Sequence, residues 1–232
     1  MYLSIHQLAP MTVEEVLGLI SDWSVVIPFL TGLLLFKKLS IDFKLITIIT
    51  ALSTVPQLMN AFKLDNDALK NFTYNLYTPF EFLLLYFIFI RHVNERKERQ
   101  VLKTSVVLYI LLSVLFIYNS GFVARFLNEW ACINNLIYTA WILIIFYNQY
   151  SLSNNSKLNL QTPVFWIFTG LLFYTPCSSI VFSIWTFKDQ PGFVALKSIH
   201  HVVNIGMYVC FTIGIYKDAL LNSSFKTNNM IS

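Results

Sequence analysis

The chain has 232 residues, of which 56% are hydrophobic and 12% are charged, and its mean hydropathy is +0.61. A soluble domain carries about a quarter charged residues, so this composition excludes an ordinary soluble enzyme and indicates an all-α membrane protein with several spans. The formal net charge is +4 and the basic residues form no continuous stripe, so we expect no nucleic-acid partner.

Seven long apolar runs follow one another along the chain. The first begins at Thr12 to Glu15, a pattern typical of a capping box, which predicts a helix start at Val13. The first twenty residues hold no Lys or Arg, so they lack the basic start of a signal peptide, and we expect the first helix to remain in the mature protein. The predicted spans cover about residues 16–36, 41–62, 71–91, 101–118, 122–147, 164–187 and 193–216.

Seven spans place the two ends of the chain on opposite sides of the membrane, and the positive-inside rule predicts which side is cytoplasmic. Eleven basic residues lie on one side: Lys37, Lys38, Lys44, Arg91, Arg96, Lys97, Arg99, Lys103, Lys157, Lys217 and Lys226. Five lie on the other: Lys63, Lys70, Arg125, Lys188 and Lys197. We therefore expect an extracytoplasmic lead (1–12), one seven-helix transmembrane domain (13–216) and a short cytoplasmic tail (217–232).

The third span carries a carboxylate far from either end. Four of its side chains share one helical face because they follow the spacing i, i+3, i+4, i+7: Tyr74, Tyr77, Thr78 and Glu81. Glu81 lies roughly 15 Å from the start of the span, near the middle of the bilayer. An ionisable residue at that depth marks a functional site by default.

Four other spans also carry polar side chains on one face. These side chains are Thr54 and Gln57 on the second span, Asn134 and Tyr138 on the fifth, Tyr174 and Ser178 on the sixth, and Lys197, His200, His201 and Asn204 on the seventh. Most lie in the extracytoplasmic half or at the midplane, which predicts a polar pocket entered from outside or from the outer leaflet. In the alternative interpretation, the same groups only form hydrogen bonds between helices.

The role of Glu81 stays open between ligand binding, proton transfer and a structural link between the third and seventh helices. Its depth suggests His201 or Lys197 as a partner. Asp22 is expected at the membrane interface, and Glu129 is expected to pair with Arg125 four residues earlier.

No metal or cofactor is predicted. His200 and His201 are adjacent, so their side chains diverge by about 100° around a helix and no third ligand stands out. The cysteines Cys132, Cys177 and Cys210 lie in apolar runs and are odd in number, which predicts small buried side chains rather than disulfides.

Prolines lie inside four of the spans. They are Pro28, Pro56, Pro79 and Pro176. Each removes a backbone hydrogen bond and can kink its helix, and kinks open space between helices.

Three segments carry a resemblance to a known group of proteins. They are NLYTPFEF in the third span, FWIFTGLLFY after a proline in the sixth, and IHHVVNIGMY with its Ile-Gly-Ile-Tyr ending in the seventh. The chain resembles a loosely defined group of small bacterial seven-helix membrane proteins of unknown function, often encoded beside sensor histidine kinases. The resemblance implies a multi-pass protein of the bacterial inner membrane in a signalling context, with a histidine-kinase-type partner, and it supplies no catalytic residues.

A second resemblance is limited to Val55-Pro56-Gln57, which is similar to the motif of PQ-loop transporters. Those proteins have two three-helix repeats joined by a linker helix, and the apolar fourth span suits that linker. The second half of the chain has Pro176-Cys177 instead of Pro-Gln, and the motif lies on the second span rather than the first.

We therefore expect a receptor-like sensor that binds a small or lipid-like ligand in an outward-facing pocket and signals to a partner, with residues 91–103 as either the cytoplasmic contact or a simple membrane anchor. The alternative is a small-solute transporter. A third hypothesis is a lipid-modifying enzyme with Glu81 and His201 as acid and base, but no nucleophile is evident beside them, so we favour a non-enzymatic role.

Overall fold

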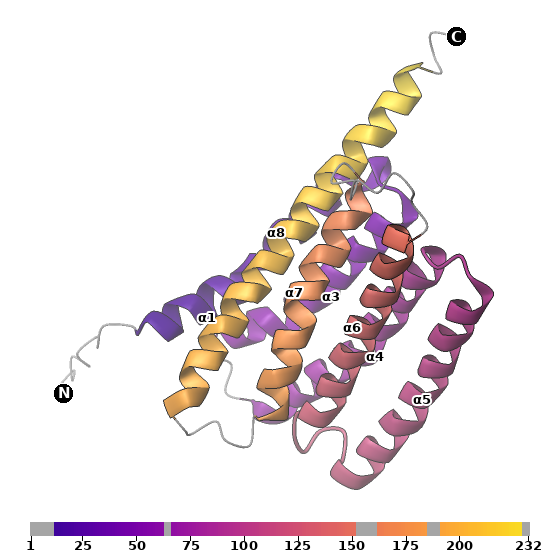
Figure 1. The fold of residues 1–232 in the computed structure, drawn as a ribbon. Coiled ribbons are helices and arrows are strands. Elements are labelled where there is room, and N and C mark those ends of the chain that lie inside the picture. Colours follow the sequence, from indigo (N-terminus) through magenta and orange to yellow (C-terminus); the bar gives the residue numbers. More distant parts are fainter. Residues whose placement is uncertain (1–11, 63–65, 152–161, 185–190, 229–232) are drawn as a thin grey trace, which may run out of the picture.

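The computed structural model describes residues 12–62, 66–151, 162–184 and 191–228, and the elements in these ranges are α-helices and one short 3-10 helix (Figure 1). In order they are α1 (Val13–Ser24), α2 (Val26–Leu35), η1 (Phe36–Lys38), α3 (Ile41–Ala61), α4 (Asp67–Arg91), α5 (Arg96–Ser120), α6 (Asn128–Ser151), α7 (Pro163–Ser183) and α8 (Pro191–Asn228). The predicted all-α fold is confirmed in these ranges. The first predicted span corresponds to α1, α2 and η1 together.

Six helical segments in the described ranges are long and apolar enough to cross a membrane. They are Val13–Lys38, Ile41–Met59, Arg96–Ser120, Asn128–Asn148, Pro163–Ser183 and Gly192–Ser224. These segments support a multi-pass membrane protein. The 25-residue α4 is not among them, because the polar side chains of its first half lower its hydropathy.

The first span is broken near its middle. α1 ends at Ser24 and α2 starts at Val26, and Pro28 removes the N–H that would otherwise bond to the Ser24 carbonyl. The other three prolines lie inside continuous helices, at Pro56 in α3, Pro79 in α4 and Pro176 in α7. At the start of α1, Thr12 Oγ1 accepts from Glu15 N (3.2 Å) and Glu15 Oε2 accepts from Thr12 N (2.8 Å), so the predicted capping box is confirmed.

The helices form a closed ring in chain order, and α5 stands outside it at one edge of the bundle (Figure 1). α1 and α2 pack against α3 and α8, α3 packs against α4, α4 against α6, α6 against α7, and α7 against α8. Spans that follow one another in the chain run in opposite directions, so the bundle has two ends. We name the end at which α4, α6 and α8 begin the mouth end, and the end at which α4 finishes and α5 begins the basic end.

Two glycines allow neighbouring helices to approach closely. A Cβ at Gly32 of α2 would lie 2.2 Å from Thr47 Oγ1 of α3, and a Cβ at Gly170 of α7 would lie 2.9 Å from Cys210 Cβ of α8. Both distances are shorter than van der Waals contact. The ring therefore closes tightly on both sides of the α2–α8 contact.

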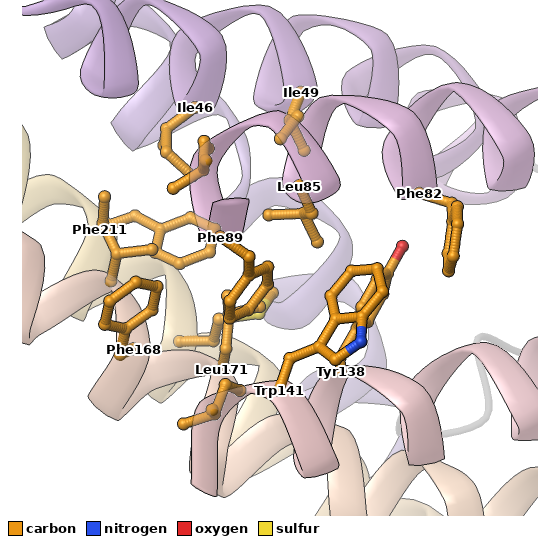
Figure 2. Close-up of a cluster of buried hydrophobic side chains, with 14 of the residues drawn as sticks. Ile46, Ile49, Phe82, Leu85, Phe89, Tyr138, Trp141, Phe168, Leu171 and Phe211 are labelled. Atoms are coloured by element: carbon orange, nitrogen blue, oxygen red, sulfur yellow. The ribbon is translucent and has the colours of Figure 1, made fainter. Parts of the chain in front are cut away.

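Large apolar side chains fill the half of the bundle toward the basic end (Figure 2). Phe82, Leu85 and Phe89 project from successive turns of α4 and are fully buried. The Phe89 ring lies 5.2 Å from the Phe168 ring and 5.3 Å from the Trp141 ring. We name this cluster, together with Ile46, Ile49, Tyr138, Leu171 and Phe211, the aromatic plug.

The basic end is held by polar contacts between helix termini. Arg91 Nε and His92 Nε2, at the end of α4, lie 2.8 Å and 3.0 Å from the carboxylate of Asp42 at the start of α3. Asp218 Oδ2 on α8 accepts from Ser40 N at 2.7 Å. These contacts link α3, α4 and α8 at one level.

The last helix extends beyond its predicted end. A polar tail was expected from Lys217, but α8 continues to Asn228 and leaves the rest of the bundle at the basic end (Figure 1). Ala219 is buried, and Asn222 Nδ2 donates to Lys38 O at 2.9 Å, so the continuation packs on η1 instead of fraying. Residues 229–232 lie outside the described ranges, as do residues 185–187 at the end of the predicted sixth span.

The helix of the fifth span begins at Asn128 rather than at Phe122, because Asn75 of α4 holds the preceding loop. Asn75 is fully buried, and its Nδ2 donates to Phe122 O (2.7 Å) and to Arg125 O (2.9 Å). Its Oδ1 accepts from Leu127 N (3.2 Å). These bonds satisfy backbone groups that a helix would otherwise satisfy, and they set the level at which α6 starts beside α4.

Candidate functional site

A cavity of about 370 Å³ opens toward the mouth end of the bundle. Its described lining comes from α1, α3, α4, α6, α7 and α8, and from Phe126 in the loop before α6. The polar lining residues are Ser21, Asp22, Thr50, Ser53, Gln57, Asp67, Lys70, Asn71, Tyr74, Tyr77, Thr78, Glu81, Asn134, Asn135, Tyr174, Lys197, His200, His201, Asn204 and Tyr208. This volume lies in the usual range for small-molecule sites.

The cavity runs from the mouth end to the aromatic plug. Asp67 and Lys70 line it in the first turn of α4, and Glu81 lines it fourteen residues after Asp67, roughly 20 Å further in. Leu85 and Phe211, which belong to the plug, close its inner end. The cavity is therefore polar along its walls and apolar at its floor.

Glu81 lies near that floor with a hydroxyl bonded to it. Tyr77 OH, one turn earlier on α4, donates to Glu81 Oε1 at 2.5 Å. Tyr174 of α7 and Tyr208 of α8 line the same cavity. Tyrosines from three helices therefore share the cavity with this carboxylate.

A second hydrogen-bonded group connects α3 to α8. Gln57 Nε2 donates to Tyr208 OH (2.6 Å) and to Ser53 Oγ (3.1 Å), and the Ser53 and Tyr208 hydroxyl oxygens lie 3.2 Å apart. The oxygen of the same amide, Gln57 Oε1, is buried and has no hydrogen-bond partner within the described ranges. This wall of the cavity therefore retains an unused acceptor.

The sequence suggested Lys197 as one possible partner of Glu81, because the two residues lie at similar depth. That pairing is wrong. Lys197 Nζ lies 2.8 Å from Glu14 Oε1, so α8 pairs with α1 there instead of with α4. Further in, Asn204 Nδ2 donates to Ser21 Oγ at 2.8 Å and joins the same two helices. Depth along a helix does not determine which neighbour a side chain faces, and α8 turns these two residues toward α1.

The two histidines occupy different surroundings. His200 Nδ1 lies 3.1 Å from Ser178 Oγ, and its ring lies 5.5 Å from the Tyr174 ring. His201 lies against α1 instead: a Cβ added at Gly18 would lie 3.4 Å from His201 Nε2. No group of three or more His, Cys, Asp or Glu that could hold a metal ion is found in the described ranges, and the three cysteines are unpaired there.

Asn134 of α6 lies at the same level as Glu81 of the neighbouring α4. Asn75 contacts Leu127, and α4 and α6 run in the same direction from that level. Glu81 follows Asn75 by six residues and Asn134 follows Leu127 by seven, so both lie roughly 9–10 Å further in. Asn134 Nδ2 donates to Tyr138 OH (3.0 Å), and its buried Oδ1 has no partner within the described ranges.

Eleven of the fourteen predicted pocket residues line the cavity. They are Gln57, Tyr74, Tyr77, Thr78, Glu81, Asn134, Tyr174, Lys197, His200, His201 and Asn204. The other three are not part of the lining. Thr54 donates to Thr50 O of its own helix, and Tyr138 packs in the aromatic plug. Ser178 Oγ lies 3.1 Å from Nδ1 of the lining residue His200. The helical spacing of the polar residues therefore predicted which helix faces line the cavity. It did not distinguish a residue that lines the cavity from one that lies just behind the lining.

Several lining residues were missed. Asp22 was expected at the membrane interface, but it lines the cavity from α1. Tyr208 bonds to Gln57 and lies 3.2 Å from Ser53 Oγ, and its i+4 spacing from Asn204 was the signal for it. Asp67 and Lys70 precede the predicted third span, and α4 begins there because Asn66 Oδ1 caps it by accepting from Leu69 N at 2.9 Å.

The remaining predicted pair is confirmed as a surface contact. Arg125 Nη2 lies 3.0 Å from Glu129 Oε1, and both side chains are about half exposed. It lies outside the cavity lining, so Glu129 offers a matched control for Glu81.

Comparison with protein-family models, with characterised proteins and with solved structures gives no match to this chain.

Proposed function

We propose that this chain is a receptor-like membrane protein that binds a small ligand in the mouth-end cavity and transmits the bound state to the basic end. The observation that carries the proposal is the cavity itself, since its walls gather polar side chains from six helices around Glu81. Hydrogen bonds between helices do not account for all of these polar groups, because Gln57 Oε1 and Asn134 Oδ1 have no hydrogen-bond partner in the described ranges.

The proposal includes seven spans, with the mouth end extracytoplasmic and the C-terminus cytoplasmic. α4 occupies a position in the ring between α3 and α6, and its polar half faces the cavity rather than lipid, which explains its low hydropathy. The excess of Lys and Arg at the basic end supports the orientation. Single cysteines at Glu95 and Val123 test it, since an impermeant thiol reagent added outside cells should label Val123→Cys and spare Glu95→Cys.

Transmission is proposed to run along α8. Its mouth-end half carries His200, Asn204 and Tyr208 into the cavity, and its other half bonds to Ser40 through Asp218. A ligand that prefers one position of α8 would shift the same helix at the basic end. A cytoplasmic signalling partner, such as the kinase type implied by the resemblance, would read that shift beside the basic segment at residues 91–103.

Native mass spectrometry of the full chain released from lipid nanodiscs tests ligand binding. The proposal predicts an added small-molecule mass on the wild-type protein that is lost in Glu81→Gln and retained in Glu129→Gln. Glu129 lies outside the cavity, so equal loss in both variants, or no added mass in any, would contradict a ligand site at Glu81.

A small-solute transporter is the second candidate, and one observation favours it. α5 lies outside the ring between two sets of three spans, and Pro56 in α3 and Pro176 in α7 occupy the middle helix of each set. Flux of the identified ligand into proteoliposomes, abolished by Glu81→Gln, would select transport. Binding without flux would select the receptor.

A further inference from the structure

The lining of the cavity is richer in acidic than in basic side chains, although the chain as a whole is basic. The sequence has a formal net charge of +4, but the lining holds three acidic side chains, Asp22, Asp67 and Glu81, against two lysines, Lys70 and Lys197. Lys197 is already paired with Glu14. Acidic side chains therefore outnumber the free lysines along the cavity.

Glu81 has no cationic partner in the described ranges. The ion pairs found there join Asp42 to Arg91 and His92, Glu129 to Arg125, and Glu14 to Lys197. Lys70 precedes Glu81 by eleven residues on the same helix, which separates their Cα atoms by roughly 16 Å. Carboxylates inside membrane proteins commonly pair with a positive group, so Glu81 is available to a cationic ligand.

The surroundings of Glu81 suit an ammonium group. Tyr77, Tyr174 and Tyr208 come from three different helices and line the cavity together with Glu81, and Tyr77 OH donates to its carboxylate. Tyrosine faces attract cations, and a carboxylate combined with aromatic rings is a common way to hold an ammonium ion. A primary ammonium also offers three donors, and Asn134 Oδ1, at the level of Glu81, is an acceptor without a partner in the described ranges.

The apolar floor sets a second requirement. Leu85, Leu171 and Phe211 line the cavity. They also belong to the aromatic plug (Figure 2). A ligand whose ammonium group bonds to Glu81 can place a hydrocarbon or aromatic portion against these side chains. A fully hydrated inorganic cation would gain nothing from that contact.

From these observations we infer that the cavity takes a small organic cation, with its ammonium group bonded to Glu81 beside the tyrosines of the lining and its apolar portion on the plug. This inference rests on the proposed function, because it assigns the chemical class of the ligand. The ammonium group comes either from a free amine or from the headgroup of an ethanolamine phospholipid.

Three probes that differ only in their polar group test the inference: phenethylamine, which is cationic at neutral pH, phenethyl alcohol, which is neutral, and phenylacetate, which is anionic. The full chain is placed in nanodiscs of phosphatidylglycerol, and binding is measured as a rise in melting temperature. Only phenethylamine should stabilise the protein. Glu81→Gln should weaken that binding by about tenfold or more, as loss of a charge-assisted hydrogen bond does, and Glu129→Gln should leave it unchanged.

Choline and spermidine extend the test to other sizes of cation. Binding of phenylacetate, amine binding that survives Glu81→Gln, or binding of none of the three cations would overturn the inference. If phenylacetate or phenethyl alcohol binds instead, the cavity remains a ligand site and only the assigned class fails. If no probe binds and native mass spectrometry finds no ligand, the proposed function fails as well.

Two further arms complete the design. Nanodiscs that contain phosphatidylethanolamine should abolish phenethylamine binding if the lipid headgroup is the source, and should leave it intact if the source is a free amine. If Glu81→Gln does not fold, dicyclohexylcarbodiimide labelling of wild-type carboxyl groups replaces it. Phenethylamine should then protect Glu81 from labelling and leave Glu129 reactive, and equal reactivity of Glu81 with and without the amine would contradict the inference.

Discussion

The two halves of α4 show how one helix can build both a cavity and its closure. Toward the mouth end its inner face carries Tyr77, Thr78 and Glu81, which line the cavity. Toward the basic end the same face carries Leu85 and Phe89, which are buried in the aromatic plug. The change takes place within about one helical turn, so Glu81 lies where polar walls meet an apolar floor.

Side chains in the two halves of α4 should therefore contribute differently to stability and to ligand binding. Side chains of the plug contact each other on all sides, and their removal leaves a void. Side chains of the cavity face an opening, so their removal alters what the cavity binds more than how the bundle holds together. Substitutions in the two halves should therefore differ in their ratio of stability loss to binding loss.

The largest effect is expected at the centre of the plug. Phe89→Ala should destabilise the bundle by about 3 kcal/mol or more, because Phe89 is fully buried against Phe168 and Trp141. Thermal or detergent unfolding in lipid nanodiscs measures this loss. Phe87→Ala is the matched control, since Phe87 is 53% exposed, and a similar loss there would argue against a plug at this position.

Asn75→Ala should follow, with a loss of about 2–3 kcal/mol. It removes three hydrogen bonds and leaves Phe122 O, Arg125 O and Leu127 N without their partner. Asn71→Ala is the control, because Asn71 makes one long bond of 3.4 Å to Val123 O. Amide hydrogen exchange of residues 122–127 should rise in Asn75→Ala and stay near wild type in Asn71→Ala.

At the basic end, Asp42→Asn should cost about 1 kcal/mol. It weakens the contacts to Arg91 and His92, but Arg91 is half exposed, so solvent already screens the pair. The loss should shrink in high salt. A loss that is independent of salt would show that Asp42 acts through hydrogen bonds rather than through charge.

The smallest change in stability is expected at Glu81. Glu81→Gln keeps the shape of the side chain and an oxygen that can accept from Tyr77 OH, so the free energy of unfolding should change by less than about 1 kcal/mol in either direction. Ligand binding should nevertheless be lost. A stability loss as large as that of Phe89→Ala would instead assign Glu81 to holding α4 in the bundle.

The helical faces could be predicted from the sequence because their period is local. Spacing alone placed Tyr74, Tyr77, Thr78 and Glu81 on one side of one helix, and all four line the cavity. The partners could not be predicted in the same way. Lys197 reaches Glu14, 183 residues earlier in the chain, and this contact depends on how α8 is rotated against α1.

The helix boundaries failed where distant contacts decide them. The segment from Phe122 to Leu127 is apolar enough to resemble the start of a span, but bonds to Asn75 keep it out of α6. The segment after Lys217 is polar enough to resemble a tail, but Asp218 and Asn222 attach it to the loop before α3. In both places a side chain far along the sequence overrides the local composition.

The central claim is that the Glu81 cavity is open at the mouth end and sealed from the basic end. Thr78→Cys, in a background without Cys132, Cys177 and Cys210, places a thiol in the cavity wall one turn before Glu81. Membrane-impermeant methanethiosulfonate reagents, one cationic and one anionic, measure access from each side of the membrane. We expect labelling of Thr78→Cys from the mouth-end side alone, faster with the cationic reagent, and no labelling of Ile88→Cys, because Ile88 is fully buried beside Phe89 of the plug. Labelling of Thr78→Cys from the basic-end side, or equal labelling of both positions, would contradict it.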